Sequence, residues 1–210
     1  MLHARGSQLA ARFSVTTKMP CFTWSLVAQK HCVVQCPYCY ARKGSYVRYK
    51  NVNKFREAND VDWRTIDWES RMIAGMSGQP YFRWFDSGDI YNVELAEKIY
   101  SVCKATPDTK HWIATKAYVR PEIAVWLKKL NTLPNVCCRY SVLKLDEFHS
   151  MRDIPHAVVS AQKSINSNMI ANLGIHLCGA TWEHDRTKGQ CGECRACWNK
   201  NVPIVSYKLH

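Results

Sequence analysis

Short apolar runs alternate with longer amphipathic stretches along most of this chain. The short runs predict strands, and they lie at residues 21–28, 80–86, 110–116, 135–143, 156–161 and 174–180. The longer stretches have the spacing of helices and lie at residues 51–76, 93–105 and 120–130. The first of them would break near Asp60, and Pro121 suits the first turn of the last. Strands that alternate with helices predict βαβ units and a parallel sheet.

Six strands are too few for a closed eight-stranded barrel. The expected fold class is α/β, as a partial barrel of the (β/α)6 type with mainly parallel strands; a doubly wound sheet is the alternative. In both folds, ligands bind at the carboxyl ends of the strands. Two polar loops fall at such ends, namely a cysteine-rich loop after residues 21–28 and the turn Ser87-Gly88-Asp89 after residues 80–86.

The length of 210 residues suits one domain with a small appended module. We expect a basic leader at residues 1–18, the partial barrel at 19–177 and a C-terminal Cys-rich cluster-binding extension at 178–210. No apolar run approaches the roughly 18 residues of a membrane span, so we expect no membrane partner. The leader contains Arg and Ser without an acid, which leaves organellar import as an alternative to a cytoplasmic location.

The net charge of +12 is concentrated in the first quarter of the chain, because ten Lys and Arg precede the first acid, Glu57. Such a surface favours polyanions, although a solubilising surface or compensation for an anionic metal cluster would explain it equally. Basic residues also alternate with Tyr46, Tyr49 and Phe55, as in surfaces that hold phosphates and stack on bases. A nucleic-acid partner would be held by Arg42, Lys43, Arg48, Lys50, Lys54 and Arg56.

Eleven cysteines favour metal binding over disulfides in a chain that we expect to be intracellular. Seven fall into two tight groups, Cys32, Cys36 and Cys39, and then Cys178, Cys191, Cys194 and Cys197. The other four are predicted to be core thiols: Cys21, Cys103, Cys137 and Cys138. The C-x3-C-x2-C spacing of the first group differs from the paired C-x2-C of zinc sites. A 4Fe–4S cluster held by three thiolates keeps one iron open; another metal site or packing thiols are the alternatives.

The first group and its surroundings resemble the radical S-adenosylmethionine (SAM) superfamily. The segments KMPCFTWSL, CPYCYARKGSY, FDSGD, ATK and CGECRACW are most similar to a phage family called gene product eighty-eight. The resemblance implies a phage-encoded protein in the host cytoplasm. It also implies that Cys32, Cys36 and Cys39 hold a 4Fe–4S cluster whose open iron binds SAM. One-electron reduction, from a donor such as a flavodoxin or ferredoxin, then gives a 5′-deoxyadenosyl radical that abstracts hydrogen from a substrate.

The same resemblance implies contacts to SAM. Ser87, Gly88 and Asp89 stand where the superfamily has two glycines and Glu, so Asp89 would pair with the methionine ammonium group. Lys116 would meet the SAM carboxylate, and Arg139 or Ser141 would contact carboxylate or ribose. Tyr38 would pack beside the cluster and adenine. The alternative for each of these residues is an ordinary turn, surface or core role.

The C-terminal group has the spacing C-x12-C-x2-C-x2-C. Four soft ligands on one compact segment predict a closed metal site. The consecutive spacing favours a second, auxiliary 4Fe–4S cluster over zinc, with His176 or His184 as alternative ligands. The function expected from the whole sequence is a radical SAM iron–sulfur enzyme with an unknown substrate. The alternatives are a non-catalytic metal protein that binds nucleic acid and an electron-transfer iron–sulfur protein.

Overall fold

The computed structural model describes residues 11–16, 18–19, 21–28, 30–43, 45–48, 50–148, 154, 156–162 and 164–209, without the side chains of Ser45 and Lys50. Most of the predicted leader therefore lies outside the described residues. Within them, no helix is long and apolar enough to cross a membrane.

The fold is α/β, with one open, mostly parallel sheet in the order β1-β2-β3-β4-β5-β6-β8-β7. The strands are β1 (Ser14–Val15), β2 (Phe22–Trp24), β3 (Tyr81–Trp84), β4 (Lys110–Thr115), β5 (Val136–Ser141), β6 (Ala157–Ala161), β7 (Ile175–Leu177) and β8 (Ile204–Lys208). Among the strands of the described residues, only β1 pairs antiparallel, with β2. All six predicted strands are confirmed as β2 to β7. The expected count of six was wrong, because β1 and β8 add to the sheet and β8 lies between β6 and β7.

The three long helical stretches are also confirmed. The first breaks as expected, into α2 (Lys50–Asp62) and α3 (Trp68–Met76), and the others are α4 (Val93–Ala105) and α5 (Pro121–Thr132). Asn92 caps α4 by accepting a hydrogen bond of 2.9 Å from the Leu95 amide. The shorter helices are η1 (Tyr40–Arg42), α1 (Ser45–Arg48), η2 (Ala117–Val119), α6 (Ser167–Leu173), α7 (Gly179–Trp182), α8 (His184–Thr187) and η4 (Ala196–Trp198).

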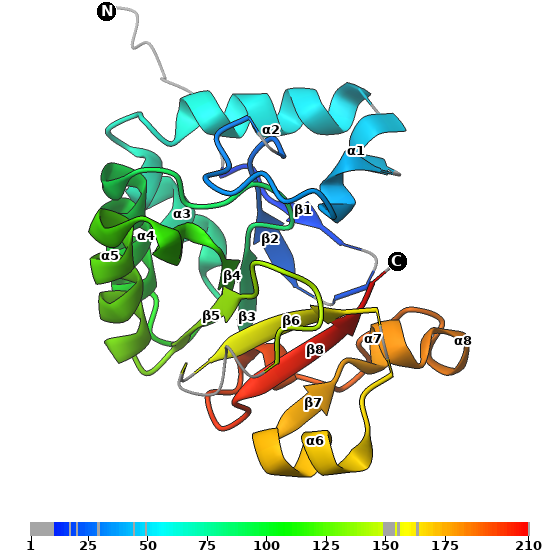
Figure 1. Cartoon of the computed structure of the whole chain (residues 1–210). Coiled ribbons are helices and arrows are strands. Elements are labelled where there is room, and N and C mark those ends of the chain that lie inside the picture. Colours follow the sequence, from blue (N-terminus) through cyan, green and yellow to red (C-terminus); the bar gives the residue numbers. More distant parts are fainter. Residues whose placement is uncertain are drawn as a thin grey trace, which may run out of the picture.

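Helices α3, α4 and α5 stand together on one side of the sheet, and α6, α7 and α8 gather beside β7 and β8 (Figure 1). Alternate residues of a strand point to opposite faces, so Phe82 and Trp84 of β3 enter the core beneath α3 to α5. Cys103 and Cys138 lie in the same core. All four cysteines predicted to be core thiols are buried.

The opposite face of the sheet, called the inner face below, carries Arg83 of β3, Trp112 of β4 and Arg139 of β5. Arg83 and Trp112 are neighbours in register, and the Arg83 guanidinium lies 4.8 Å from the centroid of the Trp112 ring. The C-terminal segment covers this face, because Trp198 of η4 stacks edge-on against Trp112 at 5.4 Å. Cys191 and Cys197 join the same cluster of side chains. The inner face is therefore a second core, built by residues from both ends of the chain.

Candidate cofactor site

The first cysteine group lies on the loop after β2, at the carboxyl end of the first parallel strand. Cys36 is buried, and Cys32 and Cys39 are half-buried. The Cys39 amide donates to the Cys36 carbonyl at 3.1 Å, and Gln35 has a left-handed φ of 49°. This turn holds Cys36 and Cys39 close together in space, next to the carboxyl edge of the sheet.

Tyr38 joins this loop to the carboxyl end of β5. Its hydroxyl lies 2.9 Å from the Val142 carbonyl and 2.8 Å from the Leu143 carbonyl. The Lys116 ammonium, which follows β4, lies 5.1 Å from the centroid of the Tyr38 ring. Burial, together with nearby Cys36, raises the pKa of Tyr38 far above its usual value. Tyr38 therefore stays a neutral donor, and its side chain joins the loop after β2 to the residues that follow β4 and β5.

Ser87 and Gly88 tie the turn after β3 to the end of β2. The Ser87 hydroxyl donates to the Leu26 carbonyl at 2.7 Å. Gly88 has φ of +78°, and a Cβ there would lie 2.7 Å from the Leu26 Cβ. Only glycine suits this close approach with a left-handed backbone. The predicted contact of Ser87 with SAM has a competing partner, because its hydroxyl is used within the protein.

Asp89 links the ends of β3 and β4. Its carboxylate accepts from the Thr115 hydroxyl at 2.5 Å and from the amides of Lys116 and Ile90 at 2.8 Å each. Burial nevertheless raises the pKa of Asp89 to about 6. Both carboxylate oxygens have partners, so Asp89 holds the main chain at Lys116 in place. Its predicted pairing with a ligand ammonium would require these bonds to be given up.

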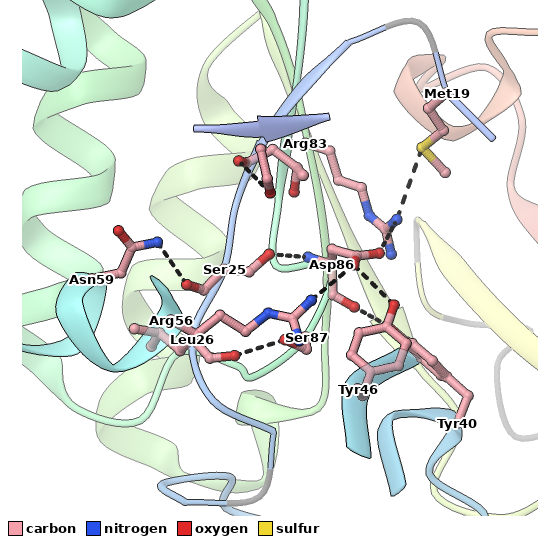
Figure 2. A network of polar contacts seen from close by, with 12 residues as sticks. Met19, Ser25, Leu26, Tyr40, Tyr46, Arg56, Asn59, Arg83, Asp86 and Ser87 are labelled. Carbon is pink, nitrogen blue, oxygen red and sulfur yellow. Dashed lines mark hydrogen bonds and ion pairs between the residues drawn. The ribbon is translucent and has the colours of Figure 1, made fainter. Parts of the chain in front are cut away.

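Asp86 is the centre of a polar network beside the cysteine loop (Figure 2). Its carboxylate accepts from Arg83 at 2.8 Å, from Arg56 at 3.3 Å and from the Tyr46 hydroxyl at 2.9 Å. The hydroxyl of Tyr40, the residue after Cys39, donates to the Asp86 carbonyl. The Asp86 amide donates to Ser25 at 2.9 Å. This network holds α1, the middle of α2 and the cysteine loop against the end of β3.

The network corrects one prediction and adds residues that the sequence analysis missed. Arg56 was assigned to a nucleic-acid surface, but its side chain is only 8% exposed because it pairs with Asp86. Arg83 and Asp86 were not among the residues predicted for the site. The available signal was an arginine and an aspartate three positions apart within an otherwise apolar and aromatic segment.

Arg139 is not brought to the cysteine loop. It is fully buried, and its guanidinium donates to the carbonyls of Cys197 at 3.0 Å, Ala196 at 2.8 Å and Asn199 at 2.8 Å. Its predicted role as a SAM contact is incompatible with this position. Ser141 ends β5 close to the loop, and its carbonyl accepts from the Tyr118 hydroxyl at 2.8 Å.

The C-terminal cysteines line one hollow of about 440 Å³, together with His176. Two of the sulfur atoms have a polar side chain within hydrogen-bond distance: Tyr207 Oη lies 2.9 Å from Cys197 Sγ, and His176 Nε2 lies 3.4 Å from Cys194 Sγ. The Cys191 amide donates to the Lys18 carbonyl at 2.9 Å, which ties the hollow to the N-terminal part of the chain.

A metal centre can be tested against these donors. Within the described residues, no group of three or more His, Cys, Asp or Glu side chains is arranged closely enough to hold a metal ion. Burial raises the pKa of Cys191 to about 11 and that of Cys197 to about 12, so both are protonated thiols at neutral pH. Thiols converge on a metal only as they lose their protons to it. The four thiols are of the right chemical type for a soft metal and line one hollow. Their sulfur atoms are not close enough together to bind a metal ion in this arrangement.

Exposed basic side chains surround the first cysteine loop on η1, α1 and α2. They belong to Arg42, Lys43, Arg48 and Lys54. In the described part of the chain, none of the four forms an ion pair with a carboxylate. The Lys50 side chain, also assigned to this surface, lies outside the described part.

Comparison with curated proteins and with solved structures gave no significant match. The family model described as gene product 88 matches residues 3–200. That match covers the cysteine loop, the turn after β3 and the C-terminal cysteines. This chain therefore belongs to the phage-protein family gene product 88.

Proposed function

We propose that this protein is a radical SAM iron–sulfur enzyme. The observation that carries the proposal is that Tyr38, between Cys36 and Cys39 on the loop after β2, contacts the residues that follow β4 and β5. In this proposal Cys32, Cys36 and Cys39 hold a 4Fe–4S cluster with one open iron. When bound, the cluster and SAM supply a 5′-deoxyadenosyl radical for hydrogen abstraction.

The order of the strands supports a partial barrel of the (β/α)6 type. A doubly wound sheet reverses its strand order at a switch point near its middle. Here β2 to β6 are neighbours in chain order, and α3, α4 and α5 cover a single face. The loops after β2, β3, β4 and β5 therefore lie along one edge, where barrel enzymes bind their substrates.

Different residues at this edge would have different roles in binding SAM. Lys116 would supply the cation for the SAM carboxylate, and the Tyr38 ring would form the wall beside adenine. Asp89 and Ser87 act as positioning residues, because they fix the main chain at Lys116 and Leu26. The side chain of Ser141 remains a candidate for ribose.

The C-terminal cysteines would hold the auxiliary 4Fe–4S cluster, with zinc as the less favoured metal. With four protein ligands, that site would be coordinatively full and would serve electron transfer or structural support. Reducing equivalents would come from a flavodoxin or ferredoxin. The exposed cations Arg42, Lys43 and Arg48 favour a nucleic acid as the substrate, since they lie next to the loop that would hold the first cluster.

The test is anaerobic reconstitution with iron and sulfide, followed by SAM and dithionite and chromatography for 5′-deoxyadenosine. We expect about eight irons per chain and formation of 5′-deoxyadenosine. Cys36→Ala should abolish the product and leave about four irons. Cys194→Ala is the matched control, because it removes an exposed thiol of the other group and should leave SAM cleavage measurable.

Two results would redirect the proposal. Colourless, zinc-loaded protein that binds oligonucleotides would favour a non-catalytic metal protein. Fully reconstituted protein that exchanges electrons but yields no 5′-deoxyadenosine would favour an electron-transfer protein.

A further inference from the structure

Arg139 is a buried cation without an anionic partner. It is 0% exposed, and within the described part of the chain its hydrogen-bond partners are all main-chain carbonyls. Carbonyl dipoles solvate the guanidinium but do not neutralise it. Because a buried charge that no anion neutralises is unfavourable, a nearby anion is expected.

Arg83 contributes a second excess positive charge to the same inner face. It shares the single carboxylate of Asp86 with Arg56, and all three side chains are at most 14% exposed. Among the described residues, the Arg83 Nε and the Trp112 Nε1 are buried donors without a partner. The inner face therefore has more buried donors and more positive charge than its carboxylates satisfy.

Both arginines adjoin the C-terminal cysteines. Arg139 is bonded to the Cys197 carbonyl, as described above. Arg83 Nη1 lies 4.0 Å from Met19 Sδ, and the neighbouring Lys18 carbonyl accepts from the Cys191 amide. Met19, Trp112, Cys191 and Cys197 belong to one cluster of side chains.

We infer that Arg83 and Arg139 are the counter-ions of a dianionic, four-thiolate metal centre formed by Cys178, Cys191, Cys194 and Cys197. The inference rests on the part of the proposed function that puts a metal in this hollow, and not on SAM chemistry. Four thiolates around Zn²⁺, or around a 4Fe–4S cluster of charge 2+, carry a net charge of about −2. Two excess guanidinium groups match that charge.

The charge balance also assigns a role to His176. A neutral imidazole in place of one thiolate would reduce the net charge to about −1 and leave one guanidinium unbalanced. His176 Nε2 lies 3.4 Å from Cys194 Sγ, so in the metal-bound state His176 would donate a hydrogen bond to that thiolate and orient it, instead of binding the metal itself.

Anaerobic titration with Co²⁺ tests this inference without SAM or iron. The protein is the full chain carrying Cys32→Ala, Cys36→Ala and Cys39→Ala, so that only the C-terminal thiols can bind. We expect one Co²⁺ per chain with the absorption bands of tetrahedral four-thiolate coordination. Arg83→Gln should weaken Co²⁺ binding about tenfold, whereas Arg83→Lys, which keeps the charge, should stay within about threefold.

Two further variants separate charge from folding. Arg186→Gln removes an exposed arginine that lines the same hollow and pairs with Glu183, and it should change affinity less than about twofold. Asp86→Asn releases Arg83 and Arg56 from their shared carboxylate and should tighten Co²⁺ binding. Partial unfolding cannot produce tighter binding. The inference is overturned by absence of Co²⁺ binding, by a spectrum with fewer than four thiolates, or by Asp86→Asn leaving affinity unchanged or weaker.

Discussion

Arg139 on β5 donates a hydrogen bond of 3.0 Å to the main-chain carbonyl of Cys197, 58 residues later in the chain. Further bonds from the same guanidinium reach the carbonyls of Ala196, Asn199 and Val202. A single side chain thus satisfies the carbonyls of the segment that carries the last cysteines. The position of that segment on the sheet depends on this arginine.

Replacing Arg139 by Met should therefore destabilise the protein by about 4 kcal/mol, because several buried carbonyls lose their donors at once. Urea unfolding followed by circular dichroism measures the change. Arg120→Met is the control, since that exposed arginine should contribute less than about 0.5 kcal/mol. A loss below about 1 kcal/mol for Arg139→Met would mean that the segment is held by its apolar contacts alone.

The titration of Asp89 should make the free energy of unfolding depend on pH. Its pKa rises from 3.8 in the unfolded chain to about 6 in the folded protein, so the folded state binds the proton more tightly. Stability should fall as pH rises from about 4 to about 6, by roughly 3 kcal/mol from this group alone. Urea unfolding of wild type and Asp89→Asn across this window should give a difference with that slope.

The difference between the two proteins is needed because His111 opposes Asp89 over the same window. Burial lowers the pKa of His111 to about 4, so its contribution to stability falls as pH drops below 6.5. That contribution is common to wild type and variant and cancels. A difference that is flat between pH 4 and 6 would show that Asp89 titrates near its ordinary value.

The sequence predicted the local elements well and the positions of the last ones poorly. Six strands and three helical stretches followed from periodicity, because each buries one apolar face. β1 is only two residues long, too short to show any period. β8 has a short apolar run, but its insertion between β6 and β7 depends on contacts with residues far earlier in the chain.

The same limit applies to the site. The spacing of Cys32, Cys36 and Cys39 marked a loop that does lie at the carboxyl edge of the sheet. Arg83 and Arg139 lie at strand positions that alternate with core residues, which is typical of a solvent face. Arg139 is buried because the C-terminal segment covers that face, and Arg83 is buried because it packs against Met19, Trp112 and Asp86. No local pattern indicates such a covering, so the carbonyl partners of Arg139, which lie 57 to 60 residues later in the chain, could not be predicted.

The close packing of Gly88 against β2 gives a matched pair of substitutions. Gly88 and Gly78 have similar φ values, +78° and +73°, but nothing lies within 4 Å of a Cβ built at Gly78. Gly78→Ala should cost about 1 kcal/mol for the left-handed backbone alone. Gly88→Ala adds the clash with Leu26 and should cost about 3 kcal/mol. Thermal or urea unfolding measures both, and equal costs would show that the turn shifts freely away from β2.

The exposed cations beside the cysteine loop should govern nucleic-acid binding. The triple variant Arg42→Gln, Lys43→Gln and Arg48→Gln should weaken binding of a single-stranded oligonucleotide. Each lost phosphate contact lowers the slope of log affinity against log salt by about 0.7, so the slope should fall by about 2. Fluorescence anisotropy at several salt concentrations measures affinity and slope together.

A matched triple variant at Arg120, which precedes α5, and at two lysines of α5 separates a specific surface from net charge. Arg120→Gln, Lys128→Gln and Lys129→Gln also remove three positive charges, but from another exposed part of the molecule. Long-range attraction falls off within about 10 Å at 0.1 M salt, so this variant should retain most of the affinity and nearly the whole salt slope. If both triple variants lose affinity equally, the attraction comes from overall charge, and the cations beside the cysteine loop do not direct a nucleic acid toward it.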